Sequence, residues 1–317
     1  MNKKLSFVFL IFFVLLAVVP SAVQAIDMET STDLEIQATT IPEMNASLSQ
    51  SFTFPVLQGN SPLTEGNNLV ATVSADISPV YIAINGELDL TPIAFLIVSA
   101  GAQLGTGWNM ALGNGIGIVT KGDNDSFGRP EMNIEGSAFS GLYWQAWGAA
   151  TFQFDLAAIF PGDWNHIVVQ SRQEFRFSGF SEAGPNDYWI FLNDDGENRN
   201  GLNYHASYTL GYMMPSSPVL NFVGLQAEIH KPLYRTEAEE IWGGDLGNWL
   251  ISAVFNFSIS PKLNSLLAFQ LWTRRNHGNP DLANRYLYYQ DMPLSEIGGN
   301  RQVLFHRAAI ILSYNLR

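Results

Sequence analysis

The sequence predicts an all-β fold, a transmembrane antiparallel β-barrel, and three observations predict it. From residue 46 onward, apolar and polar residues alternate over long segments, and no helical period of comparable length is present. Short turns that contain proline alternate with long, polar, glycine-rich links. The chain is also 13% aromatic but only 14% charged. Because side chains alternate faces along a strand, the first observation gives each strand one apolar and one polar face.

Composition excludes several classes of protein. The chain has 317 residues, a formal net charge of -13 and no cysteine. An acidic chain repels phosphate backbones, so we expect no nucleic-acid partner. The absence of cysteine excludes disulfide scaffolds, thiolate zinc sites and thiol nucleophiles.

The N-terminus has the pattern of an export signal. Lys3 and Lys4 precede an apolar run over residues 5–19, and Val23-Gln24-Ala25 has the small residues of a cleavage site. The run is shorter than the roughly 20 residues that a spanning helix needs. We therefore expect residues 1–25 to be a cleaved signal peptide on an exported protein.

The mature chain divides into two parts. Residues 26–45 form an acidic N-terminal leader that contains no base. Within it, residues 34–41 alternate and can supply a first strand. Residues 46–317 form the predicted barrel.

Eleven further strands follow from the alternation. They lie near 47–56, 68–77, 80–90, 93–105, 138–157, 165–180, 203–213, 219–230, 248–259, 263–274 and 302–316. Bacterial single-chain barrels have an even number of strands. We therefore predict twelve, counting residues 34–41, within a range of ten to fourteen; a ten-stranded barrel would leave residues 46–56 outside.

The faces of these strands are predicted by the same alternation. In the last strand, one apolar face is predicted to hold Leu304, His306, Ala308, Ile310, Leu312, Tyr314 and Leu316. Aromatic residues are expected in two belts. The first belt comprises Phe95, Phe152, Phe154, Trp164, Phe257 and Tyr314, and the second comprises Trp144, Phe177, Tyr204, Tyr208 and Trp249.

The connections are predicted to separate by length between the two ends of the barrel. Short turns are expected at 91–92, 161–163, 215–218 and 260–262, on the periplasmic side. Long external loops are expected at about 106–137, 181–202, 231–247 and 275–301. Within the loops, the glycine-rich residues 113–117 are predicted to be flexible. The apolar segment 188–192 either folds into the barrel mouth or extends the strands outward.

The final strand carries a resemblance at the level of a class. Ile310, Leu312 and Tyr314 alternate as in the last strand of outer-membrane β-barrels of double-membraned bacteria, and the whole mature sequence resembles that class. The chain departs from it in ending on Arg317 and in having Ile311 where glycine is common. The resemblance implies two partners, outer-membrane lipid and the barrel-assembly machinery.

Charged residues on the polar faces are the candidate functional residues. Arg172, Glu174 and Arg176 follow one another along one strand at a spacing of about 6.6 Å. Such residues set a transverse field that screens solutes in a channel, or they pair with one another and plug a narrow barrel. The full set of predicted lumen-lining residues is Gln153, Asp155, Arg172, Glu174, Arg176, Gln226, Glu228, Arg274 and Arg307.

Motifs for catalysis or metal binding are weak. The five histidines form no H-x-x-x-H or H-E-x-x-H pair. His166 follows a short turn near the periplasmic rim, away from where an external hydrolase would act. The acidic segments 123–125 and 193–197 lack the twelve-residue calcium pattern. We therefore expect neither enzymatic activity, nor a metal site, nor a cofactor.

Two functions from different classes follow. The first is a passive or selective diffusion channel for small polar or charged solutes. The alternative is a plugged structural or surface-interaction barrel, which would use its acidic external loops and transport nothing.

Overall fold

The structure is a computed structural model that describes most of the chain. The described residues are 28–40, 43–110, 113–124, 130–162, 164–185, 187–192, 198–214, 217, 219–233, 248–275 and 301–316. The predicted signal peptide, residues 1–25, lies outside them. No helix in this part of the chain has the length and apolar character to cross a membrane.

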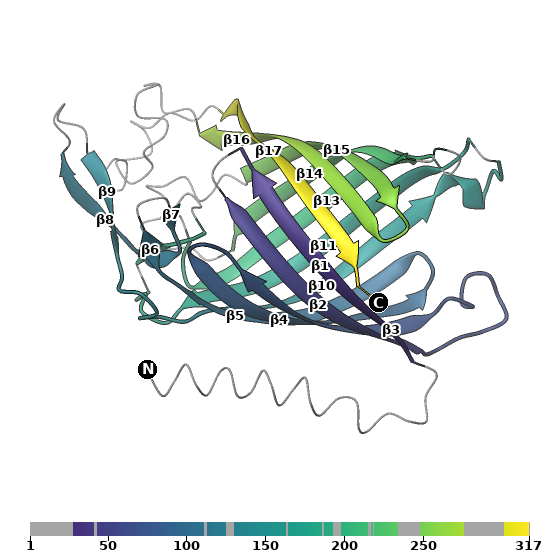
Figure 1. The fold of residues 1–317 in the computed structure, drawn as a ribbon, viewed down its shortest axis with the longest axis horizontal. Helices are drawn as coiled ribbons and strands as arrows, with labels where there is room; N and C mark the ends of the chain where they lie inside the picture. The colour runs from purple at the N-terminus through teal and green to yellow at the C-terminus, as the bar shows by residue number, and fades with distance from the viewer. Residues whose placement is uncertain are drawn as a thin grey trace.

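Twelve antiparallel strands close into a barrel, which confirms the predicted fold class (Figure 1). The closing pair is β1 with β17, in which Ile36 lies opposite Leu312. Closure leaves no unpaired strand edge, as a hydrocarbon environment requires. The barrel strands are β1 (Glu29–Thr39), β2 (Met44–Pro55), β3 (Asn68–Ile77), β4 (Tyr81–Ile93), β5 (Leu96–Gly107), β10 (Tyr143–Asp155), β11 (Ile167–Phe180), β13 (Gly201–Met213), β14 (Leu220–Pro232), β15 (Asn248–Ser260), β16 (Leu263–Arg275) and β17 (Arg301–Asn315).

The first strand settles the strand count. β1 lies inside the predicted acidic leader and begins at Glu29, five residues before the segment predicted for it. β2 pairs with both β1 and β3, so residues 46–56 belong to the barrel wall. The ten-stranded alternative is therefore wrong.

The two ends of the barrel differ in the length of their connections. At one end, here called the turn end, residues 94–95, 156–166, 214–219 and 261–262 connect neighbouring strands, and β1 begins and β17 ends there. The other end, the loop end, carries the connections over residues 108–142 and 181–200. It also carries the short turn 78–80, between β3 and β4. The predicted separation holds for the short turns and for the loops at 106–137 and 181–202, whereas most of the residues in the loops predicted at 231–247 and 275–301 lie outside the described residues. The long connection 56–67, at the turn end, departs from it.

The outer surface of the barrel is apolar. Large side chains that point outward from mid-strand positions include Leu88, Phe175, Leu225 and Phe269, each more than half exposed. Toward the rims, Phe152 and Trp144 are exposed as predicted, and Trp144 stacks on Phe177 with ring centroids 5.3 Å apart. A surface of this kind is stable only against hydrocarbon.

The last strand corrects one prediction. The register between β16 and β17 shifts at Gln270/Leu271, so His306 is an extra residue on β17. The shift reverses the faces beyond that point: Phe305 is 62% exposed on the outside, while Leu304 lies opposite Trp272. Leu304 and His306 therefore do not share the outward face of Ile310 and Leu312, because a bulge interrupts the alternation.

Short strands organise the two described loops of the loop end. β12 (Tyr188–Phe191) pairs with β8 (Ile116–Asn124), which pairs with β9 (Pro130–Glu135), and β6 (Asn109–Met110) pairs with β7 (Gly113–Asn114). The prediction that residues 113–117 are a flexible loop is wrong. A side chain at Gly115 would meet the Val80 carbonyl oxygen, so the glycine allows two backbones to approach closely.

Candidate functional site

The inner wall of the barrel is the candidate site, because alternation directs its charged side chains there. Strand pairing places Arg172 beside Thr151 and Ser207, and Glu174 beside Ala149 and His205. These neighbours all lie on inward faces, opposite in direction to the exposed apolar residues. The predicted ladder of β11 therefore faces the lumen.

Glu174 is the centre of this ladder. Its side chain is almost fully buried, with a residue exposure of 4%. Arg172 donates to its Oε2 from Nε and Nη2 at 3.2 and 3.0 Å, and Arg176 donates to its Oε1 from Nε at 2.7 Å. One carboxylate is thus shared by two guanidinium groups, and both of these groups lie beside the lumen.

Polar contacts extend the ladder across neighbouring strands. Arg172 Nη1 donates to Ser99 Oγ on β5 at 3.3 Å, and Nη2 lies 3.7 Å from Glu87 Oε1 on β4. Arg176 Nη1 donates to Gln145 Oε1 on β10 at 3.1 Å. The guanidinium groups therefore connect four strands of the wall, and their positions are determined by several partners.

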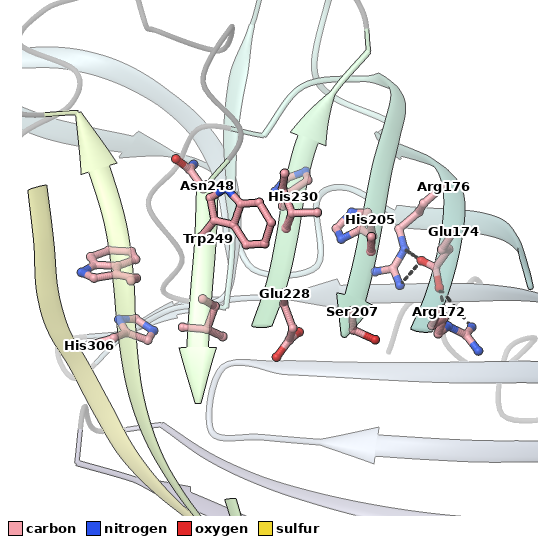
Figure 2. A pocket seen from close by; sticks show the side chains of 14 residues that line it. Arg172, Glu174, Arg176, His205, Ser207, Glu228, His230, Asn248, Trp249 and His306 are labelled. Carbon is pink, nitrogen blue, oxygen red and sulfur yellow. Dashed lines mark hydrogen bonds and ion pairs between the residues drawn. The ribbon is translucent and has the colours of Figure 1, made fainter. Parts of the chain in front are cut away.

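A cavity of about 520 Å³ opens in front of this wall (Figure 2). Besides the ladder, it is lined by His205 and Ser207 of β13 and by Glu228 and His230 of β14. Two aromatic stacks contribute to its surface: His205 with His230 at 4.3 Å, and Trp272 with His306 at 4.4 Å between ring centroids. The cavity thus combines cationic, anionic and flat aromatic surfaces. Its described lining residues are Arg172, Glu174, Arg176, His205, Ala206, Ser207, Glu228, Ile229, His230, Asn248, Trp249, Leu250, Trp272 and His306.

Arg307 anchors a second polar group nearer the loop end. Its Nε donates to Gln270 Oε1 at 2.7 Å, and Gln270 Nε2 donates to Ser252 Oγ at 3.1 Å. Its Nη1 forms an ion pair with Glu43, in the short connection between β1 and β2. Burial raises the pKa of the Glu43 carboxyl, and Arg307 offsets part of that rise.

The remaining predicted lumen residues differ in position. Gln226 lies opposite Ser252 on the inner wall. Gln153 and Asp155 lie at the turn end, where Gln153 Nε2 donates to the Ala94 carbonyl oxygen at 3.2 Å. Asp155 binds His166 Nδ1 at 2.7 Å and also accepts from the Ala157 backbone N–H, so this pair holds the turn after β10. The side chain of Arg274 lies outside the described part of the chain.

An aromatic cap covers part of the mouth at the loop end. It consists of Trp189 and Phe191 of β12 packed on inward-facing Tyr81, Tyr143 and Phe180. Phe191 stacks on Tyr143 with centroids 4.0 Å apart, and Trp189 is 1% exposed. Of the two positions predicted for residues 188–192, the structure shows the one inside the mouth.

The inner wall also has an apolar patch that was not among the residues predicted to line it. Val254, Ala268 and Ala309 are buried together on the inward faces of β15, β16 and β17, with Phe222 and Leu266 against them. The signal was present in the sequence, because Val254 interrupts the polar face of its strand. The lumen is therefore polar on one side and partly apolar on the other.

The closed barrel, its apolar outer belt and its polar inner wall define the class of this protein: it is a transmembrane β-barrel of the outer-membrane type. No protein-family model matches the sequence, and no curated protein matches it.

Among solved structures, the chain is similar to several barrels at low identity. KdgM porin is 8% identical with a TM-score of 0.39, over 90% of this chain and 99% of that chain. The translocator domain of autotransporter NalP from Neisseria meningitidis is 9% identical with a TM-score of 0.40, over 98% and 97%. An anion-selective porin from Comamonas acidovorans is 9% identical with a TM-score of 0.31, over 92% and 100%. Likeness at this level carries no inference about function.

Proposed function

We propose that this protein is a diffusion channel for small polar or charged solutes in the bacterial outer membrane. In this proposal the signal peptide at residues 1–25 directs its export to that membrane. Outer-membrane lipid surrounds it, and the barrel-assembly machinery inserts it. In this proposal the chain is a passive or selective pore without enzymatic activity.

The observation that carries the proposal is the polar cavity inside the barrel. Arg172 and Arg176 keep 29% and 28% of their side chains exposed while bonded to Glu174, so their charge is available to a solute. Small barrels of eight strands are filled by side chains, whereas barrels of sixteen enclose open channels. A twelve-stranded barrel with a cavity of this size lies between these cases and suits small solutes.

The arrangement acts on a solute through a transverse field. The two guanidinium groups lie on β11, whereas Glu228 lies on β14, further round the same cavity (Figure 2). A solute that passes between them meets charges of opposite sign on different parts of the wall. Solutes are therefore selected by charge distribution and by size.

The alternative function, a plugged barrel for structure or surface interaction, is favoured by a specific observation. Each guanidinium of the ladder already bonds protein carboxylates or amides, and the aromatic cap covers part of the mouth. Mutual pairing of this kind satisfies interior charges without conduction.

Single-channel recording distinguishes the two functions. The mature chain would be refolded in detergent, inserted into a planar bilayer and compared with Arg172→Ala and Arg176→Ala under a salt gradient. We expect discrete current steps, and we expect each variant to shift the reversal potential toward cation permeation, since a positive charge leaves the wall. Lys262→Ala, which removes a positive charge from the turn between β15 and β16, is the control.

A barrel that folds and inserts but remains electrically silent would refute the channel. Heat-modifiable gel migration establishes folding independently of current. Conduction that responds equally to Lys262→Ala and to Arg176→Ala would show that the ladder does not line the path.

A further inference from the structure

Two histidines that are distant in sequence meet on the inner wall. His205 of β13 lies directly opposite His230 of β14 in the register, and their rings are stacked with centroids 4.3 Å apart and planes 12° apart. Both are half-buried and both line the cavity (Figure 2). Two protonated rings this close, beside Arg176, would repel one another, so at most one carries a charge.

A buried amide determines which nitrogen of His230 carries the proton. Asn203, 5% exposed, donates from Nδ2 to Ser178 Oγ at 3.3 Å and to the Gly201 carbonyl oxygen at 3.2 Å. Its Oδ1 therefore faces His230 Nε2, at 3.3 Å. An amide oxygen only accepts, so Nε2 is the donor and Nδ1 keeps a lone pair. Metal-binding imidazoles show the same arrangement, in which the second ring nitrogen donates to an oxygen atom.

A carboxylate that forms no hydrogen bond or ion pair within the described part of the chain lies beside the pair. Glu228 precedes His230 by two residues on the same face of β14 and lines the same cavity. Among the described residues it has neither a hydrogen-bond nor an ion-pair partner. A partly buried carboxylate in this state is costly unless a cation approaches it. Arg307 acts on it electrostatically but is bonded to Gln270 and Glu43, and Arg172 and Arg176 are directed to Glu174.

We propose that His205 and His230 bind a divalent transition-metal ion of the Cu²⁺, Ni²⁺ and Zn²⁺ class inside the barrel. His230 coordinates through Nδ1, His205 through one ring nitrogen, and water completes the shell; Glu228 balances the charge of the ion. Imidazole is a preferred ligand of these ions, with metal–nitrogen distances of about 2.0–2.1 Å. The stacked rings must tilt for both lone pairs to converge on one ion.

The site is of moderate affinity because it offers two protein ligands. No group of three or more histidine, aspartate or glutamate side chains in the described part of the chain is placed to hold a metal ion. Moderate affinity suits a lumen site, where an ion must both enter and leave. The proposal goes beyond the diffusion function and does not depend on conduction.

Copper binding to the refolded barrel tests the site. A chain without an affinity tag would be titrated with Cu²⁺ in detergent, and electron paramagnetic resonance would count the nitrogen ligands. We expect one saturable Cu²⁺ with coupling to two nitrogens. His205→Gln and His230→Gln should each weaken binding at least about tenfold. His166→Gln, which removes an imidazole at the turn end, is the matched control and should bind as the wild type does.

Equal Cu²⁺ affinity in wild type, His205→Gln and His230→Gln would overturn the proposal, as would a wild type with no saturable binding. Heat-modifiable migration checks folding, and either variant suffices if the other fails to fold. A silent barrel that binds Cu²⁺ through both histidines would refute the channel and support the metal site. A conducting barrel that does not bind Cu²⁺ through these histidines would support the channel and refute the metal site.

Discussion

At the scale of single residues, the charge that the inner wall presents to a solute depends on which charged side chains pair with one another. Glu174 is buried and bonded by two guanidinium groups, so it lowers the positive charge of the wall without being exposed itself. Within β11 the partly exposed charges therefore belong to Arg172 and Arg176, and Glu87 of β4 is as exposed as Arg172 beside it. Removing either arginine and removing Glu174 should have opposite effects on selectivity.

Glu174→Gln should make the pore more selective for anions. The substitution keeps the shape of the side chain but removes the negative charge that both guanidinium groups share, so Arg176 loses its carboxylate partner while Arg172 keeps Glu87 at 3.7 Å. A unit charge at about 4 Å is worth about 1 kcal/mol even in water, which corresponds to a change of up to about fivefold in the permeability ratio. The reversal potential under a salt gradient measures it. Glu65→Gln, on the exposed connection between β2 and β3, should leave the ratio unchanged; an equal shift there would contradict a local effect.

At the scale of elements, the barrel mouth is organised by one asparagine. Asn200 accepts from the Phe180 backbone N–H at 2.8 Å and from Trp189 Nε1 at 3.1 Å, and its Nδ2 donates to the carbonyl oxygens of Phe180 and Ala183. It thereby connects the end of β11 to β12. Arg199, 2% exposed, lies 4.3 Å above the ring of Tyr188 and adds to the same cap.

Asn200→Ala should loosen the cap but leave the barrel wall intact. Several buried polar groups lose their partner, and each such loss costs about 1–3 kcal/mol. Hydrogen exchange should therefore become faster in residues 187–192, while exchange in β14 and β15 stays slow. Asn68→Ala, which removes an exposed hydrogen bond to the Gly66 carbonyl oxygen, should change neither region. Uniformly faster exchange in the barrel strands would show that Asn200 supports the whole wall.

At the scale of the whole molecule, the fold depends on the opposite character of two surfaces. Adjacent residues on one strand illustrate it: Leu225 is 58% exposed on the outer surface, whereas Gln226 faces the interior opposite Ser252. The outer surface is stable in hydrocarbon and the inner one in water. If both surfaces were apolar, the inner one would be unstable in water; if both were polar, the outer one would be unstable in hydrocarbon.

Leu225→Arg should destabilise the barrel far more than Gln226→Arg. Both positions lie at the middle of β14, and an arginine on the lipid-facing surface near the bilayer centre costs about 2–4 kcal/mol. The same side chain on the inner wall remains in a polar lumen. Denaturant titrations of the barrel in lipid vesicles, followed by tryptophan fluorescence, measure both free energies of unfolding. Equal costs would show that the two faces are not in different environments.

Much of the fold followed from the sequence because strand alternation is a local property. The segments 68–77 and 263–274 were predicted to within a residue, since turn residues and period-two patterning are both visible in the chain. The bulge at His306 was not predicted, because the position of an extra residue in a strand is ambiguous until the pairing with the neighbouring strand is known. The start of β1 was missed for a related reason: its acidic residues obscure the pattern.

The sequence by itself determined the class of this protein, the face of most strands and the charges of the inner wall, because the side-chain period of a strand is independent of its neighbours. The tertiary structure alone decided which inward residues meet. Glu174 with its two arginines follows from one strand, whereas the pairing of His205 with His230 depends on the register between two strands. Register is set by turns and by packing across the whole barrel, so no local pattern contains it.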